Sequence, residues 1–346
     1  MSPASWPRQW PLEERLLVVD PSRGRFEAHR VRDLTQFVSA RDLLVINDAA
    51  TFPASLRGAT AAGEAVEARL LLSREGAWRA VLFGAGDWRT RTEDRPPPPR
   101  VREGDALVFT SLRARVERVL HPSGRLVALR FEASDESLWS ALYRHGRPVQ
   151  YAHTRAPLAL WHVQTPFASR PWASEMPSAS RPLAWELVLA LRARGARFAT
   201  VTHAAGLSST GDAGLDAALP LRESFDVGAE TMRAIASTRA GGGRVIAVGT
   251  SVVRALESAA RANASSGDTD LLVNEHHALS AVDALFTGMH EPGTSHDALL
   301  HAFAPAPLLS RAHAHALANG FLGHEFGDSM LIARGALADA SDRRSW

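Results

Sequence analysis

Short apolar runs separated by glycine, proline and charged residues mark the first part of the chain. "RLLVVD" at 15–20 and "LLVIN" at 43–47 are typical of buried strands, because they are brief and rich in branched aliphatic residues. Residues 64–131 hold several more β-rich runs, and "HPSGR" at 121–125 indicates a hairpin turn between two of them. Short strands at this spacing predict a small antiparallel barrel. "RTEDRPPPPR" should form an exposed loop within it, because proline cannot join a central strand.

Helix and strand patterns alternate from about residue 180 onward. A helix is expected in "SRPLAWELVLALRARG", capped by Ser180, and a strand in "RFATVTH". The later segments with the same alternation are "GAETMRAIASTRAGGG" (helix), "RVIAVG" (strand), "TSVVRALESAARA" (helix), two helices separated at Pro305 and Pro307, and "GDSMLIA" (strand). This alternation predicts an α/β fold with mostly parallel strands.

These patterns together predict a discontinuous architecture. Residues 1–60 and 151–346 should form the α/β domain, and residues 61–150 an inserted β-barrel. Such an arrangement places a cleft between two bodies. Ligands favour such junctions and the carboxyl ends of parallel strands.

Composition narrows the possible chemistry. The 346 residues include no cysteine, which excludes disulfides, thiolate metal sites and a cysteine nucleophile. They include no lysine either, which excludes Schiff-base catalysis. The 39 basic residues barely exceed the 37 acidic ones, so no overall nucleic-acid signature is present. No apolar run approaches the ~18 residues of a membrane span, and we expect a cytoplasmic protein.

Seven motifs follow one another in an order that matches a known family. They are "RLLVVD", "DLLVINDAATFPASL" with Asn47 and Asp48, "VQTPFA" with Gln164 and Thr165, "VTHAAGLSST" with Gly206, "GGGRVIAVGTSVVRALESAA" with Gly249, Thr250, Ser251 and Arg254, "ALFTGMHEP" with His290, and "FGDSMLI". Together they resemble the S-adenosylmethionine:tRNA ribosyltransferase-isomerases of queuosine biosynthesis over some 300 residues.

Several motif positions differ from the family pattern. Ala50 and Ser55 stand where the family carries arginines. A family histidine is missing from "PSASRPL", and a second has moved one place to His203. Gly288 and Gly293 replace an asparagine and a lysine. These changes leave the expected fold unaffected and bear on the reaction.

The resemblance implies transfer of the ribosyl part of S-adenosylmethionine onto 7-aminomethyl-7-deazaguanine in tRNA, giving epoxyqueuosine. Adenine and methionine leave, and no metal is needed because the sulfonium is already an electron sink. The expected partners are S-adenosylmethionine and tRNA, without a membrane, in a monomer or weak homo-oligomer. Two alternatives stay open: an enzyme of this fold that uses S-adenosylmethionine on a small molecule, and a non-catalytic binding descendant.

The start of the helix in the Gly249 motif is the first candidate ligand site. The amides of Gly249, Thr250 and Ser251 would favour a carboxylate or phosphate oxygen, and Arg254 lies one turn further on. The alternative is that Thr250 or Ser251 only caps the helix and that Arg254 is solvated.

Candidate catalytic residues are few. His203 is the leading general base, because histidine titrates near neutrality; the alternative is a structural histidine. His290 matches a family position, and Glu175 is a weaker acid–base candidate.

Further residues are candidates for holding substrate groups. Asn47 and Asp48 could hold hydroxyl or amide groups, although Asp48 could equally cap a turn. The resemblance assigns Gln164 and Thr165 to adenine or ribose, and Ser178 and Gly206 complete the binding set.

Overall fold

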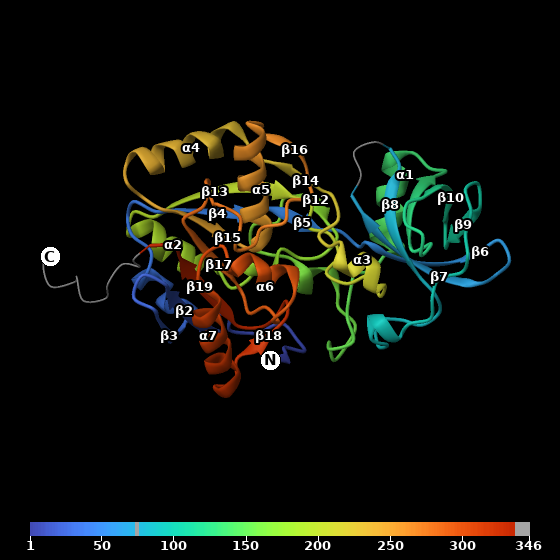
Figure 1. The fold of residues 1–346 in the computed structure, drawn as a ribbon. Helices are drawn as coiled ribbons and strands as arrows, with labels where there is room; N and C mark the ends of the chain where they lie inside the picture. The colour runs from blue at the N-terminus through green and yellow to red at the C-terminus, as the bar shows by residue number, and fades with distance from the viewer. Residues whose placement is uncertain (73–75, 336–346) are drawn as a thin grey trace, which may run out of the picture.

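A nine-stranded sheet domain and a closed six-stranded barrel lie side by side in the computed structural model, which describes residues 1–72 and 76–335 (Figure 1). The strand order of the sheet is β16-β14-β13-β4-β15-β17-β19-β2-β3. Its strands are β2 (Arg15–Asp20), β3 (Arg25–Arg30), β4 (Leu43–Asn47), β13 (Arg197–His203), β14 (Glu223–Asp226), β15 (Val245–Val248), β16 (Ser266–Thr269), β17 (Ala284–Gly288) and β19 (Ser329–Ala333). The four central strands β13, β4, β15 and β17 are parallel. The predicted α/β class is confirmed.

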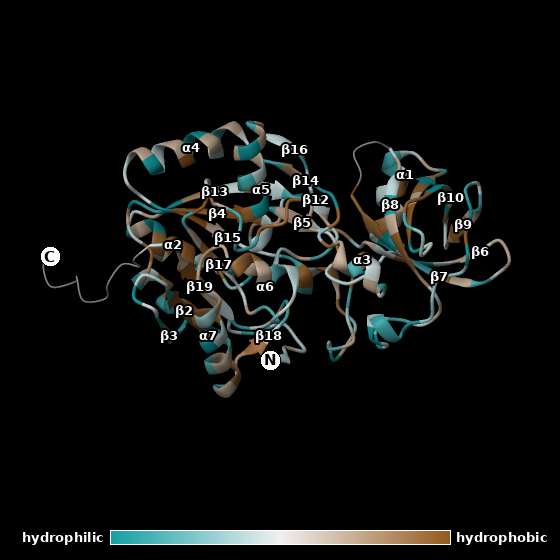
Figure 2. Ribbon diagram, viewed as in Figure 1, coloured by the Kyte–Doolittle hydropathy of each residue, from teal (hydrophilic) through white to brown (hydrophobic). Residues whose placement is uncertain are grey.

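Helices cover both faces of this sheet. Successive side chains of its strands point to opposite faces, and the side chains on both faces are apolar. Leu43 and Val45 of β4 pack with the helices on one face, whereas Leu44 and Ile46 face the other. The first face carries α4 (Ala229–Ala240), α5 (Thr250–Ala262), α6 (Ser295–Leu300) and α7 (Ala306–Ala318), and the second carries α2 (Trp185–Ala193). Figure 2 shows the central strands as the most hydrophobic elements of this domain.

The barrel confirms the antiparallel insertion expected from the short β-rich runs. Its strand order is β10-β11-β8-β7-β6-β9. The strands are β6 (Ser55–Thr60), β7 (Ala65–Leu71), β8 (Trp78–Phe83), β9 (Ala106–Phe109), β10 (Leu112–Val119) and β11 (Leu126–Phe131), followed by α1 (Asp135–His145). The hairpin turn at 121–125 joins β10 to β11, as predicted.

The chain enters and leaves the barrel at adjacent points. Before the barrel, β5 (Ala49–Thr51) pairs in parallel with β12 (Arg170–Ala173), which follows it. An isolated bridge between Ser55 and Arg147 joins the same two connections closer to the barrel. The division at residues 60 and 150 stays a prediction, although the barrel already includes β6.

The remaining elements are short. They are β1 (Ser2–Pro3), which pairs with β18 (Leu322–Gly323), α3 (Ala213–Ala217), and five 3-10 helices: η1 (Pro11–Glu13), η2 (Val31–Gln36), η3 (Thr92–Asp94), η4 (Leu160–Val163) and η5 (Ser178–Ser180). No helix within residues 1–72 and 76–335 is long and apolar enough to cross a membrane.

One local prediction is wrong, and another holds only in part. Ser180 does not cap a helix: it ends η5, and α2 starts at Trp185 after Ala184. The proline-rich loop is not exposed throughout, because Arg95 is buried and bonded to the carbonyl oxygen of Gly84 at 2.7 Å.

Candidate active site

Four parallel strands end at one edge of the sheet, and predicted site residues gather there. Asn47 ends β4 and His203 ends β13, while Gly249 follows β15 and His290 follows β17. The first residues of α5 lie above this edge. The carboxyl ends of parallel strands in a doubly wound sheet are where ligands bind, so the topology itself brings these positions together.

Asn47 holds two of these strands together. Its side-chain oxygen accepts hydrogen bonds from the amides of Ala49 and His203, both at 3.0 Å. Its side-chain nitrogen donates to the carbonyl oxygen of His203 at 3.0 Å and to the hydroxyl of Ser251 at 3.4 Å. The amide group is therefore occupied by the protein, and it positions His203 and the start of α5.

Gly249 makes the sharp turn from β15 into α5. Its φ of +104° lies in a region that favours glycine, and a Cβ there would be 3.3 Å from that of Ala179. Gly249 is the N-cap and no side chain caps the helix, so the interpretation of Thr250 or Ser251 as a cap is wrong. Ser178 begins the 3-10 helix η5 that includes Ala179, and its binding role stays a prediction.

His203, Glu223 and Arg254 form a buried group beneath the start of α5. One guanidinium nitrogen of Arg254 lies 2.5 Å from a carboxylate oxygen of Glu223, and Nε2 of His203 lies 3.4 Å from the same oxygen. The other carboxylate oxygen accepts a hydrogen bond from the amide of Gly206 at 2.7 Å. Arg254 is therefore not solvated; it compensates a buried carboxylate.

Burial controls the protonation of this group. Desolvation, with a further contribution from Arg254, holds the pKa of His203 well below 6.5, so the imidazole is neutral at pH 7. Desolvation also raises the pKa of Glu223, while Arg254 opposes that rise. His203 thus does not titrate near neutrality as expected. Neither ring nitrogen makes a hydrogen bond to the described residues, although Nε2 lies 3.4 Å from Glu223 and the ring is fully buried.

Two further histidines extend the site from β17 to α6. The rings of His290 and His296 stack with centroids 5.0 Å apart. His296 shares a hydrogen bond with the hydroxyl of Thr250 at 2.9 Å, and His290 shares one with that of Thr287 at 2.8 Å. Burial lowers the pKa of His290 well below 6.5 and that of His296 to about 4. Both rings are neutral at pH 7 and can donate or accept hydrogen bonds.

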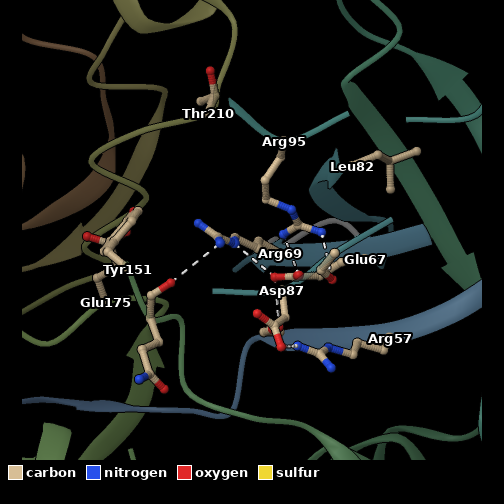
Figure 3. Close-up of polar contacts among 12 residues, drawn as sticks. Arg57, Glu67, Arg69, Leu82, Asp87, Arg95, Tyr151, Glu175 and Thr210 are labelled. Atoms are coloured by element: carbon tan, nitrogen blue, oxygen red, sulfur yellow. Dashed lines mark hydrogen bonds and ion pairs between the residues drawn. The ribbon is translucent and has the colours of Figure 1, made fainter. Parts of the chain in front are cut away.

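Glu175 belongs to a second polar network, between the barrel and the sheet domain (Figure 3). It accepts hydrogen bonds from the hydroxyl of Tyr151 and from the amide and hydroxyl of Ser208. Desolvation raises the pKa of Glu175. The guanidinium of Arg69 lies 5.2 Å from the centre of the Tyr151 ring. Burial thus makes this carboxyl group easier to protonate than a solvent-exposed glutamate, although its hydrogen bonds from Tyr151 and Ser208 oppose that rise.

A buried ion cluster supports this network from the barrel side (Figure 3). Arg69 and Arg95 bind the two oxygens of Glu67 at 3.0 and 2.5 Å. The hydroxyl of Ser55 donates to Glu67 at 3.0 Å, and Ser55 lies directly opposite Arg69 in the β6–β7 pair. A guanidinium therefore sits across the ladder from the position where the family motif has its second arginine.

Three predicted site residues have other partners. The hydroxyl of Thr202 donates to the carboxylate of Asp48 at 2.5 Å. The side chain of Gln164 makes two hydrogen bonds to the backbone of Thr51, at 2.8 and 3.0 Å, and Thr165 accepts one from the amide of Phe167 at 3.3 Å. These contacts hold the connections around β5, and a ligand role for the three residues stays a prediction.

Glu223, His296, Tyr151 and Arg69 were not identified from the sequence. Each lies in a segment without a motif, and each meets its partner only through the tertiary fold. For Arg69 a signal was present, because a charged residue within the apolar run "EARLLLS" requires a buried partner.

Comparisons with known proteins agree with this architecture. A family model described as queuosine biosynthesis protein matches residues 3–332. The S-adenosylmethionine:tRNA ribosyltransferase-isomerase of Anaeromyxobacter sp. (strain K) is 36% identical over 332 residues, with 92% of each chain covered. That of Azoarcus sp. (strain BH72) is 36% identical over 342 residues, covering 94% of this chain and 93% of the relative.

A solved structure is similar as well. The crystal structure of S-adenosylmethionine tRNA ribosyltransferase from Thermotoga maritima superposes with a TM-score of 0.53 at 25% identity, covering 95% of both chains. The resemblance inferred from the motifs is thereby confirmed. The chain belongs to the queuosine biosynthesis protein family, together with the S-adenosylmethionine:tRNA ribosyltransferase-isomerases.

Proposed function

We propose that this chain is an S-adenosylmethionine:tRNA ribosyltransferase-isomerase that converts 7-aminomethyl-7-deazaguanine in tRNA to epoxyqueuosine. Family membership over residues 3–332 supports the reaction class. The observation that carries the proposal is the buried group of His203, Glu223 and Arg254 beneath the first turn of α5. Unpartnered polar atoms at a strand edge beneath a helix start are what a bound polar ligand would satisfy.

The roles of the residues follow from their surroundings. The amides of Thr250 and Ser251 would hold the methionine carboxylate of S-adenosylmethionine, whereas the expected amide of Gly249 already donates to the carbonyl oxygen of Phe286 at 2.8 Å. His203 is neutral at pH 7 and its Nδ1 makes no hydrogen bond to the described residues, so it would take a proton from the sulfonium-activated carbon. Glu175, whose pKa is raised by burial, would exchange a proton at the tRNA side of the cleft. His290 and His296 would contribute neutral hydrogen bonds to the sugar.

The acceptor is the part of the proposal that needs the most direct support. A tRNA acceptor agrees with the names of the relatives and would place the reaction in the cytoplasm, in a monomer or weak homo-oligomer. No metal is needed for ribosyl transfer because the sulfonium already withdraws electrons. The small-molecule alternative is favoured by Ala50, which stands in place of a motif arginine.

One experiment separates these possibilities. Purified protein is incubated with labelled S-adenosylmethionine and tRNA carrying 7-aminomethyl-7-deazaguanine, and nucleosides and small molecules are identified by mass spectrometry. We expect adenine, methionine and an epoxyqueuosine-bearing tRNA, with His203→Gln lowering turnover more than S-adenosylmethionine affinity. Binding of S-adenosylmethionine without adenine release from this tRNA would favour a small-molecule acceptor. Absence of binding would refute both enzymatic proposals.

A further inference from the structure

Two histidines and a glutamate from distant parts of the chain meet outside the site described above. His153 lies in the connection that follows the barrel, and His324 and Glu325 lie in the loop between β18 and β19. Their ligand atoms all lie within 4.8 Å of one another. We propose that His153, His324 and Glu325 bind a divalent transition-metal ion, with Zn²⁺ as the best match, which clamps this connection to the sheet domain.

The distances suit a zinc ion. Zinc binds imidazole nitrogen and carboxylate oxygen at about 2.0–2.2 Å, so neighbouring ligands of a tetrahedral site lie about 3.3 Å apart. Nε2 of His153 lies 3.2 and 3.1 Å from the two oxygens of Glu325, which already matches this separation. The ligand atom of His324 lies at most 4.8 Å from the other two. It must therefore move by about 1.5 Å or less to reach the tetrahedral separation, which a side-chain rotation can supply.

The surroundings hold the two imidazoles in place. The rings of His153 and His324 are 4.4 Å apart, and the Tyr151 ring stacks on His153 at 6.3 Å and 13°. The backbone of His324 has a φ of +66°, an uncommon conformation for a residue other than glycine, which fixes the direction of its side chain. The imidazoles therefore do not rely on each other for their positions.

Charge and donor type also favour a cation of this kind. Glu291 lies 3.3 Å from Nε2 of His324, and a carboxylate beside a metal-binding imidazole orients the ring and strengthens it as a ligand. The carboxylates of Glu291 and Glu325 lie beside the two histidines, and their negative charge favours a cation. A set of two nitrogens and one oxygen matches zinc better than magnesium or calcium, which prefer oxygen alone.

An ion-paired brace without a metal is the competing explanation, because His153 and Glu325 would also attract each other when the imidazole is protonated. The metal clamp predicts one bound ion per chain and a melting temperature that rises with Zn²⁺. The ion-paired brace predicts neither. The clamp is separate from ribosyl transfer, so its failure leaves the proposed function standing.

The test uses the full chain after treatment with EDTA and dialysis. Zn²⁺ is titrated by calorimetry at pH 7.5, and the melting temperature is measured with and without one equivalent. We expect one ion per chain with a micromolar or tighter Kd and a rise in Tm of several degrees. His153→Gln and Glu325→Gln should each weaken binding at least 100-fold. His276→Gln, at an exposed histidine paired with Glu275, serves as the matched control and should bind as the wild type does.

Two outcomes would overturn the clamp. One is wild-type binding no tighter than that of His153→Gln. The other is equal loss of binding in His276→Gln, which would mean that surface histidines collect the ion. Circular dichroism of each variant shows whether it folds, and the conservative His324→Asn replacement provides an independent ligand deletion should one of the others unfold.

Discussion

Replacing Arg254 by alanine tests the buried ion pair at the centre of the candidate active site. Glu223 would keep its hydrogen bond from Gly206 but lose the guanidinium of Arg254, which lies 2.5 Å from its carboxylate. Removing one member of a buried pair costs about 3–5 kcal/mol, because an uncompensated charge stays in the interior. We therefore expect Arg254→Ala to lower the free energy of unfolding by this amount at pH 8, besides weakening ligand binding.

The pH dependence gives the prediction its sign. Burial already raises the pKa of Glu223 above 4.5, and Arg254 restrains that rise. Without Arg254 the folded variant keeps the Glu223 proton to higher pH than its unfolded chain does. Its free energy of unfolding therefore falls as pH rises above 4.5 through the folded-state pKa. The deficit relative to wild type should be smaller at pH 5 than at pH 8.

Urea denaturation followed by circular dichroism at both pH values measures this difference. The double variant Arg254→Met with Glu223→Gln removes both charges, and we expect it to recover most of the lost stability at pH 8. An equal deficit at pH 5 and pH 8, or a double variant no more stable than Arg254→Ala, would refute the assignment of a buried ion pair.

Three further predictions concern other parts of the structure. Asn47→Ala removes the acceptor of two buried amides and should cost about 2–5 kcal/mol in urea unfolding; a loss below 1 kcal/mol would contradict its role in joining β4 to β13. Arg69→Ser should destabilise the barrel by about 3–5 kcal/mol, because Glu67 loses a buried partner. Adding Ser55→Arg on the opposed strand should restore much of this loss, and no recovery would mean that the new guanidinium does not reach Glu67. Because the pKa values of His290 and His296 are lowered, the unfolded chain takes up their protons first as pH falls below 6.5; stability should decline from there toward pH 4, and His296→Gln should flatten that decline.

Most of the fold could be predicted because the signal is local. The runs at 15–20 and 43–47 carry enough consecutive apolar residues to indicate a strand without knowledge of their neighbours, and 197–203 is rich in β-branched and aromatic residues. The predicted helix start at Ser180 was wrong because a serine followed by a proline is also compatible with a separate 3-10 helix, here η5. Packing of Ala179 against Gly249 stabilises that turn, and no local pattern reports such a contact.

The candidate site could be predicted only in part for the same reason. Asn47, His203 and Gly249 end or follow recognisable strands, so the topology of parallel sheets places them together. Glu223 begins the short strand β14 and His296 lies in the short helix α6, and nothing near either residue in the sequence indicates its partner. The sequence also suggested free polar groups where the structure has occupied ones, as in Asn47, because hydrogen-bond satisfaction depends on the whole fold.

The adjacent entry and exit of the barrel have an evolutionary consequence. Strand β5 lies beside β12, and Ser55 bridges Arg147. The barrel is therefore joined to the sheet domain through two adjacent connecting segments. Such a module can be lengthened or exchanged with little disturbance to the strand order of the nine-stranded sheet. Differences in length and sequence among relatives are therefore expected to accumulate in the barrel first, and a chimaera that carries a relative's barrel between residues 55 and 147 would test whether the sheet domain tolerates the exchange.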